Sequence, residues 1–312
     1  MKLHQLTSKS LFAFAKRFPV LAELILARNI VNTEAVDEFV KNFHVEDLPE
    51  VNAWLDAAMR KYLINRYDKV KKYTPKESDP DWMKSKTDLE AVILNDELAQ
   101  KVQHVVDFLK NTLASNPEFK LGAFQAEEAF KQADKWSEQL QKKKTGEEEE
   151  GKDFKIIMTL DGGWNWVDVI SENGLAREGK LMGHCVGGYW DRVKAGAEKI
   201  LSLRDPQNEP HATIEYHPRQ SKISQIKGKQ NRALKAEYIP YLLAFLKSPP
   251  VPVRKIEEYD IQANGLVKSK EGYLSLQNLP DGAVIDQDLD LKKFPDVVLP
   301  RNLTVNGDLK LG

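Results

Sequence analysis

The sequence has a single cysteine, Cys185, among its 312 residues, so no disulfide can form within the chain. Such a composition is typical of a reducing compartment. Long apolar runs are missing too. The first residues, MKLHQLTSKSLFAFAKRF, lack the continuous apolar stretch and cleavage site of a signal peptide, and no window approaches the roughly 18–20 apolar residues of a membrane-spanning helix. We therefore predict a cytoplasmic protein with no membrane partner.

An excess of one charge sign is also absent, because the formal net charge is -1. No field of the whole chain therefore attracts nucleic acid or a membrane surface. Residues 155–254 nevertheless hold 15 Lys and Arg against 10 Asp and Glu, which predicts a local basic surface there. The chain has no P-loop, no strand–GxGxxG–helix element and no C-x-x-C or H-x-x-x-H spacing. We therefore predict no cofactor and no metal site.

The first part of the chain, residues 1–145, has the apolar spacing of about 3.6 residues that predicts helices. The expected helices lie within residues 11–27, 34–43, 51–70, 89–113 and 124–140. The run KKKTGEEEEGK at 142–152 has no apolar residue, so we interpret it as a solvated linker.

From Phe154 the apolar period changes to two, which predicts a second domain at 153–250 built on strands. The expected strands lie at 154–160, 164–170, 199–204, 212–216 and 222–226, with helices at 189–194 and 233–246. Because consecutive strands are only a few residues apart, the sheet is expected to be antiparallel.

The last part, residues 258–312, contains a repeat in which 279–291 matches 299–311 at an offset of 20 residues. Short L-x-L units with turns are typical of a β-solenoid, although ordinary hairpins are the alternative. Stable stacks usually need about three units, so this stack is either truncated or capped by the preceding domain. The predicted fold class is α+β: a helical N-terminal region, a central antiparallel-sheet module and short C-terminal β-solenoid-like repeats.

Polar residues recur at alternate positions of three expected strands, which places them on one face of the sheet. They are Ser202 and Arg204, Thr213 and Glu215, and Gln225 and Lys227. This face is either solvated or the floor of a ligand pocket. If Arg204 and Glu215 lie on paired strands and face the same way, they are expected to form a charge-assisted pair.

Cys185 lies among glycines and just before an expected helix, and a helix N-terminus favours the nucleophilic thiolate. The alternative is a small buried apolar residue. His184 is adjacent in sequence and therefore points elsewhere, so a base for the thiol is expected at His211 or His217. His184 itself either positions a ligand or is structural. A metal site that uses His184, Cys185 and a remote ligand is less favoured.

The same segment resembles the PcfJ-like family of conjugative plasmids, phages and related mobile elements, over roughly residues 155–245. The resemblance lies in EG at 178–179, MGHCVGGY at 182–189, ILSLR at 200–204, TIE at 213–215 and QIKGKQN at 225–231. The C-terminal repeat is similar to arrays in phage proteins. The resemblance implies an accessory protein of a mobile element, without naming a reaction.

Three functions are compatible with these residues. In the first, an enzyme uses Cys185, His184 and Glu215 as catalytic residues on a phosphate-containing ligand. The residues expected to bind that ligand, a nucleic acid or nucleotide, are Arg204, Gln225, Lys227, Lys229 and Asn231. In the second, the basic segment is a non-catalytic nucleic-acid-binding adaptor. In the third, the protein inhibits a host defence factor and binds a host protein through the C-terminal repeats.

Overall fold

The structure, a computed structural model, describes residues 49–71, 96–142, 145–291, 294 and 297–310. The chain divides into two compact units with the boundary between Gln139 and Leu140, and each is described by itself. The helices expected at 11–27 and 34–43 lie outside the described residues. Within the described part of the chain, no helix is both long enough and apolar enough to cross a membrane.

The first unit contains three described α-helices: α4 (Pro49–Lys71), α6 (Asp96–Ser115) and α7 (Ala126–Lys142). Their apolar residues recur every three or four positions and form one core, which includes Leu55, Met59, Val102, Val106, Leu109 and Ala129. The indole N–H of Trp54 donates to the carbonyl of Phe124 at 2.9 Å and ties α4 to the segment before α7. The helices predicted at 51–70 and 124–140 are thus confirmed.

The second unit is built on a six-stranded sheet in the order β1-β2-β3-β4-β5-β6. Its strands are β1 (Phe154–Thr159), β2 (Asn165–Val169), β3 (Lys199–Arg204), β4 (Pro210–His217), β5 (Lys222–Lys227) and β6 (Lys255–Ile256). The first five pair antiparallel, and β6 adds parallel to β5. The predicted antiparallel sheet and α+β class are therefore confirmed.

One face of this sheet is apolar. Trp166, Leu203 and Ile214 point to this face and are fully buried. They pack in one core with residues of α10 (Ile239–Lys247), such as Phe245. This helix lies within the one predicted at 233–246, although it begins later, after the short turn η7 (Ala236–Tyr238).

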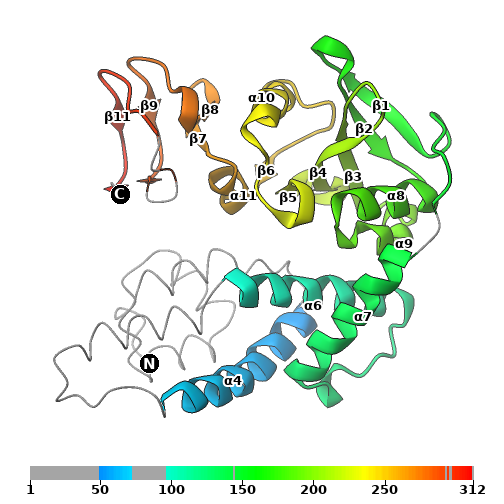
Figure 1. Cartoon of the computed structure of the whole chain (residues 1–312). Helices are drawn as coiled ribbons and strands as arrows, with labels where there is room; N and C mark the ends of the chain where they lie inside the picture. The colour runs from blue at the N-terminus through cyan, green and yellow to red at the C-terminus, as the bar shows by residue number, and fades with distance from the viewer. Residues whose placement is uncertain (1–48, 72–95, 143–144, 292–293, 295–296, 311–312) are drawn as a thin grey trace, which may run out of the picture. The chain divides into compact units, whose positions relative to one another are not determined.

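The opposite, polar face of the sheet is covered by α8 (Glu172–Met182), a helix that was not predicted from the sequence. In Figure 1, α8 and α10 lie on different sides of the sheet. The helix begins at the N-cap Ser171, whose hydroxyl accepts a hydrogen bond from the Gly174 amide at 2.9 Å. It ends at Gly183, whose φ of 69° is left-handed and suits glycine. The short helices η4 (Cys185–Gly188) and α9 (Trp190–Lys194) follow.

The C-terminal segment begins with a helix, α11 (Glu258–Ala263), so the expectation of β-structure from residue 258 is wrong at its start. A hairpin of β7 (Leu266–Ser269) and β8 (Gly272–Ser275) follows. Four two-residue strands come next: β9 (Val284–Ile285), β10 (Leu289–Asp290), β11 (Thr304–Val305) and β12 (Leu309–Lys310). They form the parallel pairs β9–β11 and β10–β12.

The two parallel pairs join residues that are 20 positions apart, such as Val284 with Thr304 and Leu289 with Leu309. The side chains follow the same offset, because the amide of Asn306 donates to the Asp286 carboxylate at 2.8 Å. The repeat therefore has a structural counterpart. Two such units, preceded by a hairpin, do not make a solenoid within the described residues.

Candidate functional site

Glu178 of α8 points onto the polar sheet face and accepts hydrogen bonds from two neighbouring strands. Its carboxylate accepts hydrogen bonds from the hydroxyl of Ser202 on β3 at 2.9 Å and from the hydroxyl of Thr213 on β4 at 2.6 Å. The Nη2 group of Arg204 donates to the same carboxylate at 2.8 Å. Glu178 is fully buried. The face is therefore a buried, hydrogen-bonded polar layer rather than a solvated surface.

Arg204 lies between two carboxylates, since its Nη1 group also donates to Glu148 at 2.8 Å. Only 1% of the Arg204 side chain is exposed. Burial opposes its charge, but the carboxylates of Glu178 and Glu148 outweigh that effect and raise the pKa of Arg204. Arg204 thus binds Glu178 and Glu148 instead of the expected Glu215, and it offers no surface to a ligand.

The segment expected to be a solvated linker, residues 142–152, supplies one of these carboxylates. Glu148 is fully buried at its side chain and binds Arg177 at 3.1 Å as well as Arg204. Its neighbours Glu147 and Glu149 are exposed. The solvated-linker interpretation is therefore wrong at Glu148, whose charge is removed from water and paired.

His184 connects two motifs that are 44 residues apart in the chain. Its Nε2 atom lies 2.7 Å from the carbonyl oxygen of Gly228, which can only accept, so Nε2 carries the proton. Burial lowers the pKa of His184 to about 4; the hydrogen bond to Gly228 opposes this shift, and the charge of Lys227 adds to it. His184 is therefore neutral near pH 7 and anchors the segment that follows β5.

The segment after β5 forms a short loop, residues 228–232, over the end of α8. Gln230 and Asn231 have left-handed φ values of 59° and 56°, which are unfavourable for residues with a side chain. Gln230 packs over Gly183, where a Cβ atom would lie 3.3 Å from its Cγ. Lys229 and Arg232 are exposed, and Asn231 is half-buried.

Lys227 precedes this loop and is held by α11. Its ammonium group lies 2.8 Å from the Asp260 carboxylate, which also accepts the Ile226 amide at 3.0 Å. Asp260 is fully buried, whereas 17% of the Lys227 side chain is exposed. Lys227 is therefore a partly exposed cation with a fixed position beside the loop. Asp260 had no local signal in the sequence.

Cys185 is the first residue of η4 and is 4% exposed. It lies between His184 and Gly187, in a turn that packs against α8 at Gly179. Of the two expected bases, His211 contacts Asp205 at 2.9 Å, and His217 contacts Ser224 at 3.0 Å. Catalysis by Cys185 stays a prediction.

We expect Gly179→Ala to destabilise the second unit by about 1–3 kcal/mol, as overpacking of a tight contact does. A Cβ at this position would lie 2.8 Å from the Gly187 nitrogen and 3.0 Å from the His184 oxygen. Both are backbone atoms and cannot rotate away. Urea denaturation with hydrogen exchange read at α8 and η4 measures the effect. Gly146→Ala, whose Cβ meets Asn173 at an ordinary 3.7 Å, is the control; equal stability of the two variants contradicts the prediction.

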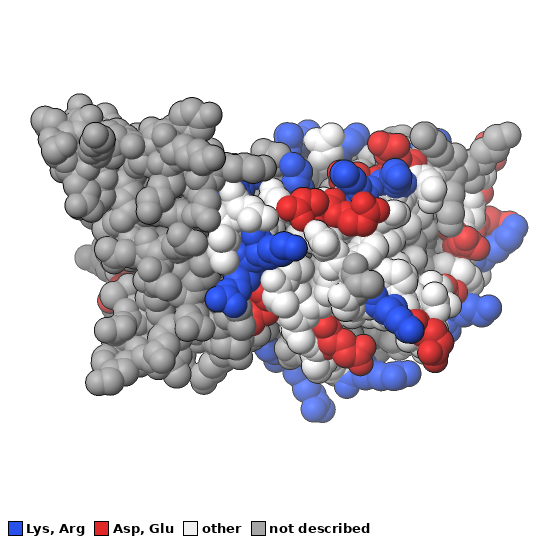
Figure 2. Space-filling model, turned by 90° about the horizontal axis from the view of Figure 1, so that it is seen from below, with Lys and Arg blue, Asp and Glu red and all other residues white. Residues whose placement is uncertain are grey.

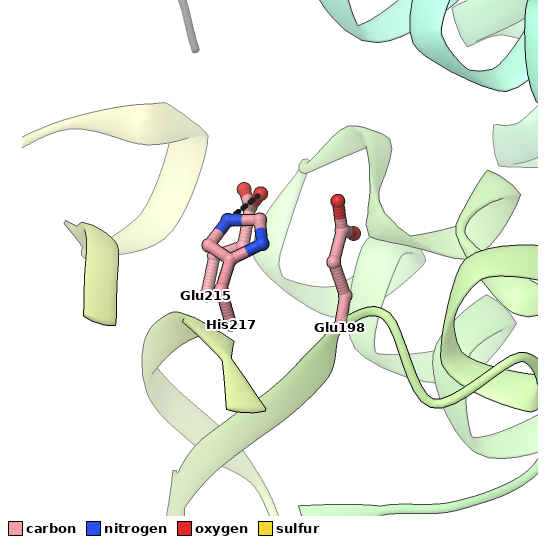
Figure 3. Close-up of side chains that lie close together, drawn as sticks. All are labelled: Glu198, Glu215 and His217. Atoms are coloured by element: carbon pink, nitrogen blue, oxygen red, sulfur yellow. Dashed lines mark ion pairs between the residues drawn. The ribbon is translucent and has the colours of Figure 1, made fainter. Parts of the chain in front are cut away.

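Glu215 belongs to a third group of side chains at one end of the polar face. Its Oε1 atom lies 3.3 Å from Nε2 of His217, two residues along β4. Glu198, just before β3, completes the group, in which one ligand atom from each of the three residues lies within 4.8 Å of the others (Figure 3). Gln225 pairs with Glu215 across β4 and β5 and is buried. Glu215 was predicted as a site residue from the sequence, whereas Glu198 was not.

The predicted site residues thus fall into three groups on or beside one sheet face. Arg204 binds carboxylates at one end, Glu215 and Gln225 lie at the other, and His184 lies with the loop that carries Lys229 and Asn231. The structure brings the 182–189 and 225–231 motifs into contact through His184. It does not bring Arg204 and Glu215 together.

Fold and contacts together define an α+β module whose sheet has one apolar and one buried polar face. Residues 94–242 match a family model described as PcfJ-like protein, which supports the resemblance to that family. The match begins at residue 94, so it includes α6 and α7 and extends further toward the N-terminus than the resemblance seen at roughly residues 155–245. No curated protein and no solved structure matches the chain.

Proposed function

We propose that the second unit binds a phosphate-containing ligand, a nucleic acid or nucleotide, at the loop 228–232 beside His184. The observation that carries the proposal is the hydrogen bond between His184 and Gly228, at 2.7 Å. It joins the two motifs of the PcfJ-like resemblance at one place. That place presents the exposed cations Lys229 and Arg232, with Lys227 beside them.

The backbone of the loop supports the same function. Successive residues with helical and left-handed φ values make a concavity of backbone N–H groups, which is an anion-binding geometry. The segment 229–231 contains two residues with left-handed φ values, Gln230 and Asn231, and neither is glycine. Strain of this kind costs about 1–3 kcal/mol for each residue and concentrates at ligand sites.

Charge supports a local contact rather than a broad basic surface. The net charge is -1, and on the face shown in Figure 2 basic and acidic side chains are interspersed. Binding therefore depends on a few placed cations, and its affinity is expected to fall with salt concentration.

We expect the double variant Lys229→Gln/Arg232→Gln to weaken binding of a fluorescent single-stranded oligonucleotide by about tenfold or more at low salt. The slope of log affinity against log salt is expected to fall in magnitude by about 1.4, which is roughly 0.7 for each lost contact to a single strand. Fluorescence polarisation with single-stranded DNA and RNA, using the full chain, measures both quantities.

The matched control is Lys155→Gln/Lys247→Gln, which removes the same charge from exposed positions of β1 and α10. It is expected to bind like the wild type. If both double variants lose the same affinity, the loss comes from the change in net charge, and this result contradicts a binding site at the loop. Absence of any binding by the wild type at low salt contradicts the proposal as a whole.

Two further proposals concern the setting of this activity. We propose an accessory protein of a phage or plasmid that acts in the cytoplasm of the host cell, as the resemblance to the PcfJ-like family implies. The C-terminal repeats, whose Val298 is 85% exposed, are proposed to contact a host protein. If this contact with a host protein is the whole function, the protein is an inhibitor of a host defence factor.

An enzymatic role is the second candidate function, and the group around Glu215 favours it. Glu215 contacts His217, so a carboxylate and an imidazole lie together at 3.3 Å, as in acid–base sites. Cys185 stays the proposed nucleophile, but it is only 4% exposed and a buried thiol is less reactive than an exposed one, so covalent catalysis is placed second.

A further inference from the structure

Glu198, Glu215 and His217 converge at the end of the polar face away from Arg204. Glu215 and His217 are two residues apart on β4, so they project from the same side of the strand. Glu198 reaches them from the residue before β3, which pairs with β4. All three are buried, with 4%, 4% and 8% of their surfaces exposed. Two carboxylates and an imidazole are thus withdrawn from water at one point.

We infer that these three side chains bind one divalent transition-metal cation, Mn²⁺ or Zn²⁺. One ligand atom from each residue lies within 4.8 Å of the others. Oxygen and nitrogen ligands sit roughly 2.0–2.2 Å from such ions, so ligand atoms on opposite sides of an ion are about 4 Å apart. The separations of up to 4.8 Å exceed this distance by less than about 1 Å, so a bound cation requires the three side chains to draw slightly closer. Imidazole favours Zn²⁺ and related ions, and carboxylates favour Mn²⁺.

The hydrogen bonds of His217 set the ring for this role. The Ser224 hydroxyl donates to the Glu215 carbonyl at 3.3 Å, so its oxygen is the acceptor for Nε2 of His217 at 3.0 Å. In the neutral ring Nε2 then carries the proton, and Nδ1 carries the lone pair that binds a metal. Metal-binding histidines usually donate their other N–H in this way. In Figure 3 the Nε2 edge faces Glu215, and Glu198 lies on the other side of the ring.

Arg192 of α9 holds Glu198 in position. Its Nε atom lies 3.2 Å from Oε2 of Glu198, and its guanidinium stacks on the Tyr189 ring at 3.8 Å. Tyr189 is the last residue of the 182–189 motif, and Arg192 lies three residues later, in α9. The motif therefore contributes to the metal site through the placement of Glu198.

The cation site goes beyond the proposed binding of phosphate and stands without it, because none of its three ligands lies in the loop 228–232. The spacing of histidines along the chain gave no sign of it, since its single histidine joins two carboxylates from different strands. The sequence-based expectation of no metal site is replaced by this inference.

Calorimetric titration of the chelator-treated full chain with MnCl₂ or ZnCl₂ tests the site. The wild type is expected to bind one equivalent, and Glu215→Gln and His217→Gln are each expected to weaken binding by at least about tenfold. The control His211→Gln removes a histidine of the same sheet that pairs with Asp205 at 2.9 Å, and it is expected to bind normally. Circular dichroism checks that each variant is folded.

A measurement on the wild type covers the case in which a variant does not fold. Mn²⁺ is paramagnetic, so it should broaden the ring signals of His217 before those of the other five histidines. No binding at millimolar metal, unchanged binding in folded Glu215→Gln and His217→Gln, or broadening centred on another histidine each overturns the inference. The readout uses no phosphate ligand, so its failure leaves the proposed function standing.

Discussion

Arg204→Met is expected to destabilise the second unit by about 3–5 kcal/mol, the usual effect of removing one partner from a buried ion pair. The substitution leaves the carboxylates of Glu178 and Glu148 without the guanidinium that lies 2.8 Å from each. Both carboxylate side chains have no exposed surface, so water cannot replace it. Urea denaturation of the full chain, read by hydrogen exchange in β3 and β4, measures the loss in this unit alone.

Arg219→Met is the matched control, because Arg219 is exposed in the turn η5 (Pro218–Gln220). It is expected to change stability by less than about 0.5 kcal/mol. Arg204→Lys is expected to lie between the two, since an ammonium keeps the charge but cannot bind two carboxylates in one plane. If Arg204→Met is as stable as the wild type, the ion pairs of Arg204 with Glu178 and Glu148 do not stabilise the polar face, and the prediction is wrong.

Acidification from pH 6.5 to pH 4 is expected to destabilise the second unit by up to about 3 kcal/mol through His184 alone. The folded pKa of His184 is about 4, against its ordinary value of 6.5. Between these values the unfolded chain binds a proton that the folded chain excludes, so acid favours unfolding. Above pH 6.5 this residue contributes no pH dependence, and below pH 4 its loss of stability is complete.

The variant His184→Gln separates this effect from the titration of carboxylates. Glutamine cannot titrate, and its amide can still donate to the Gly228 carbonyl that His184 contacts at 2.7 Å. Urea denaturation at pH 7, 6, 5 and 4 should therefore give a shallower decline for the variant than for the wild type. Parallel declines of the two proteins would contradict a neutral, buried His184.

The strands were predictable because their chemistry is local. In 199–204 and 212–216 apolar and polar residues alternate, and the observed strands begin and end within about two residues of the predicted ones. The helix α8 was missed because Gly174, Gly179 and Gly183 give its segment the composition of a loop. Its caps, Ser171 and Gly183, were the available signals.

For the polar face, the local sequence pattern predicted the side of each strand but not what covers that side. Alternation correctly placed Ser202 and Arg204 on one side of β3, and Thr213 and Glu215 on one side of β4. It offered a solvated face or a pocket floor, whereas α8 covers the face and Glu178 binds three of its side chains. Which helix covers a face depends on tertiary packing, and no alternation within a strand records it.

Interaction partners from distant segments of the chain could not be predicted from the sequence either. Glu148 is one of four consecutive glutamates, and only the fold distinguishes it from its exposed neighbours. Lys227 was named as a ligand contact, but its partner Asp260 lies 33 residues further along the chain. The family-like motifs did indicate which segments meet, because His184 and Gly228 belong to two of them.

The most direct test of the phosphate-binding site is an amide chemical-shift titration of the full, isotope-labelled chain with a short single-stranded oligonucleotide. The largest shifts are predicted at Lys229, Gln230 and Arg232, with smaller ones at Gly183 and His184, and they should weaken as salt is added. Shifts confined to the first unit or to the C-terminal repeats, with the loop unchanged, would contradict the account.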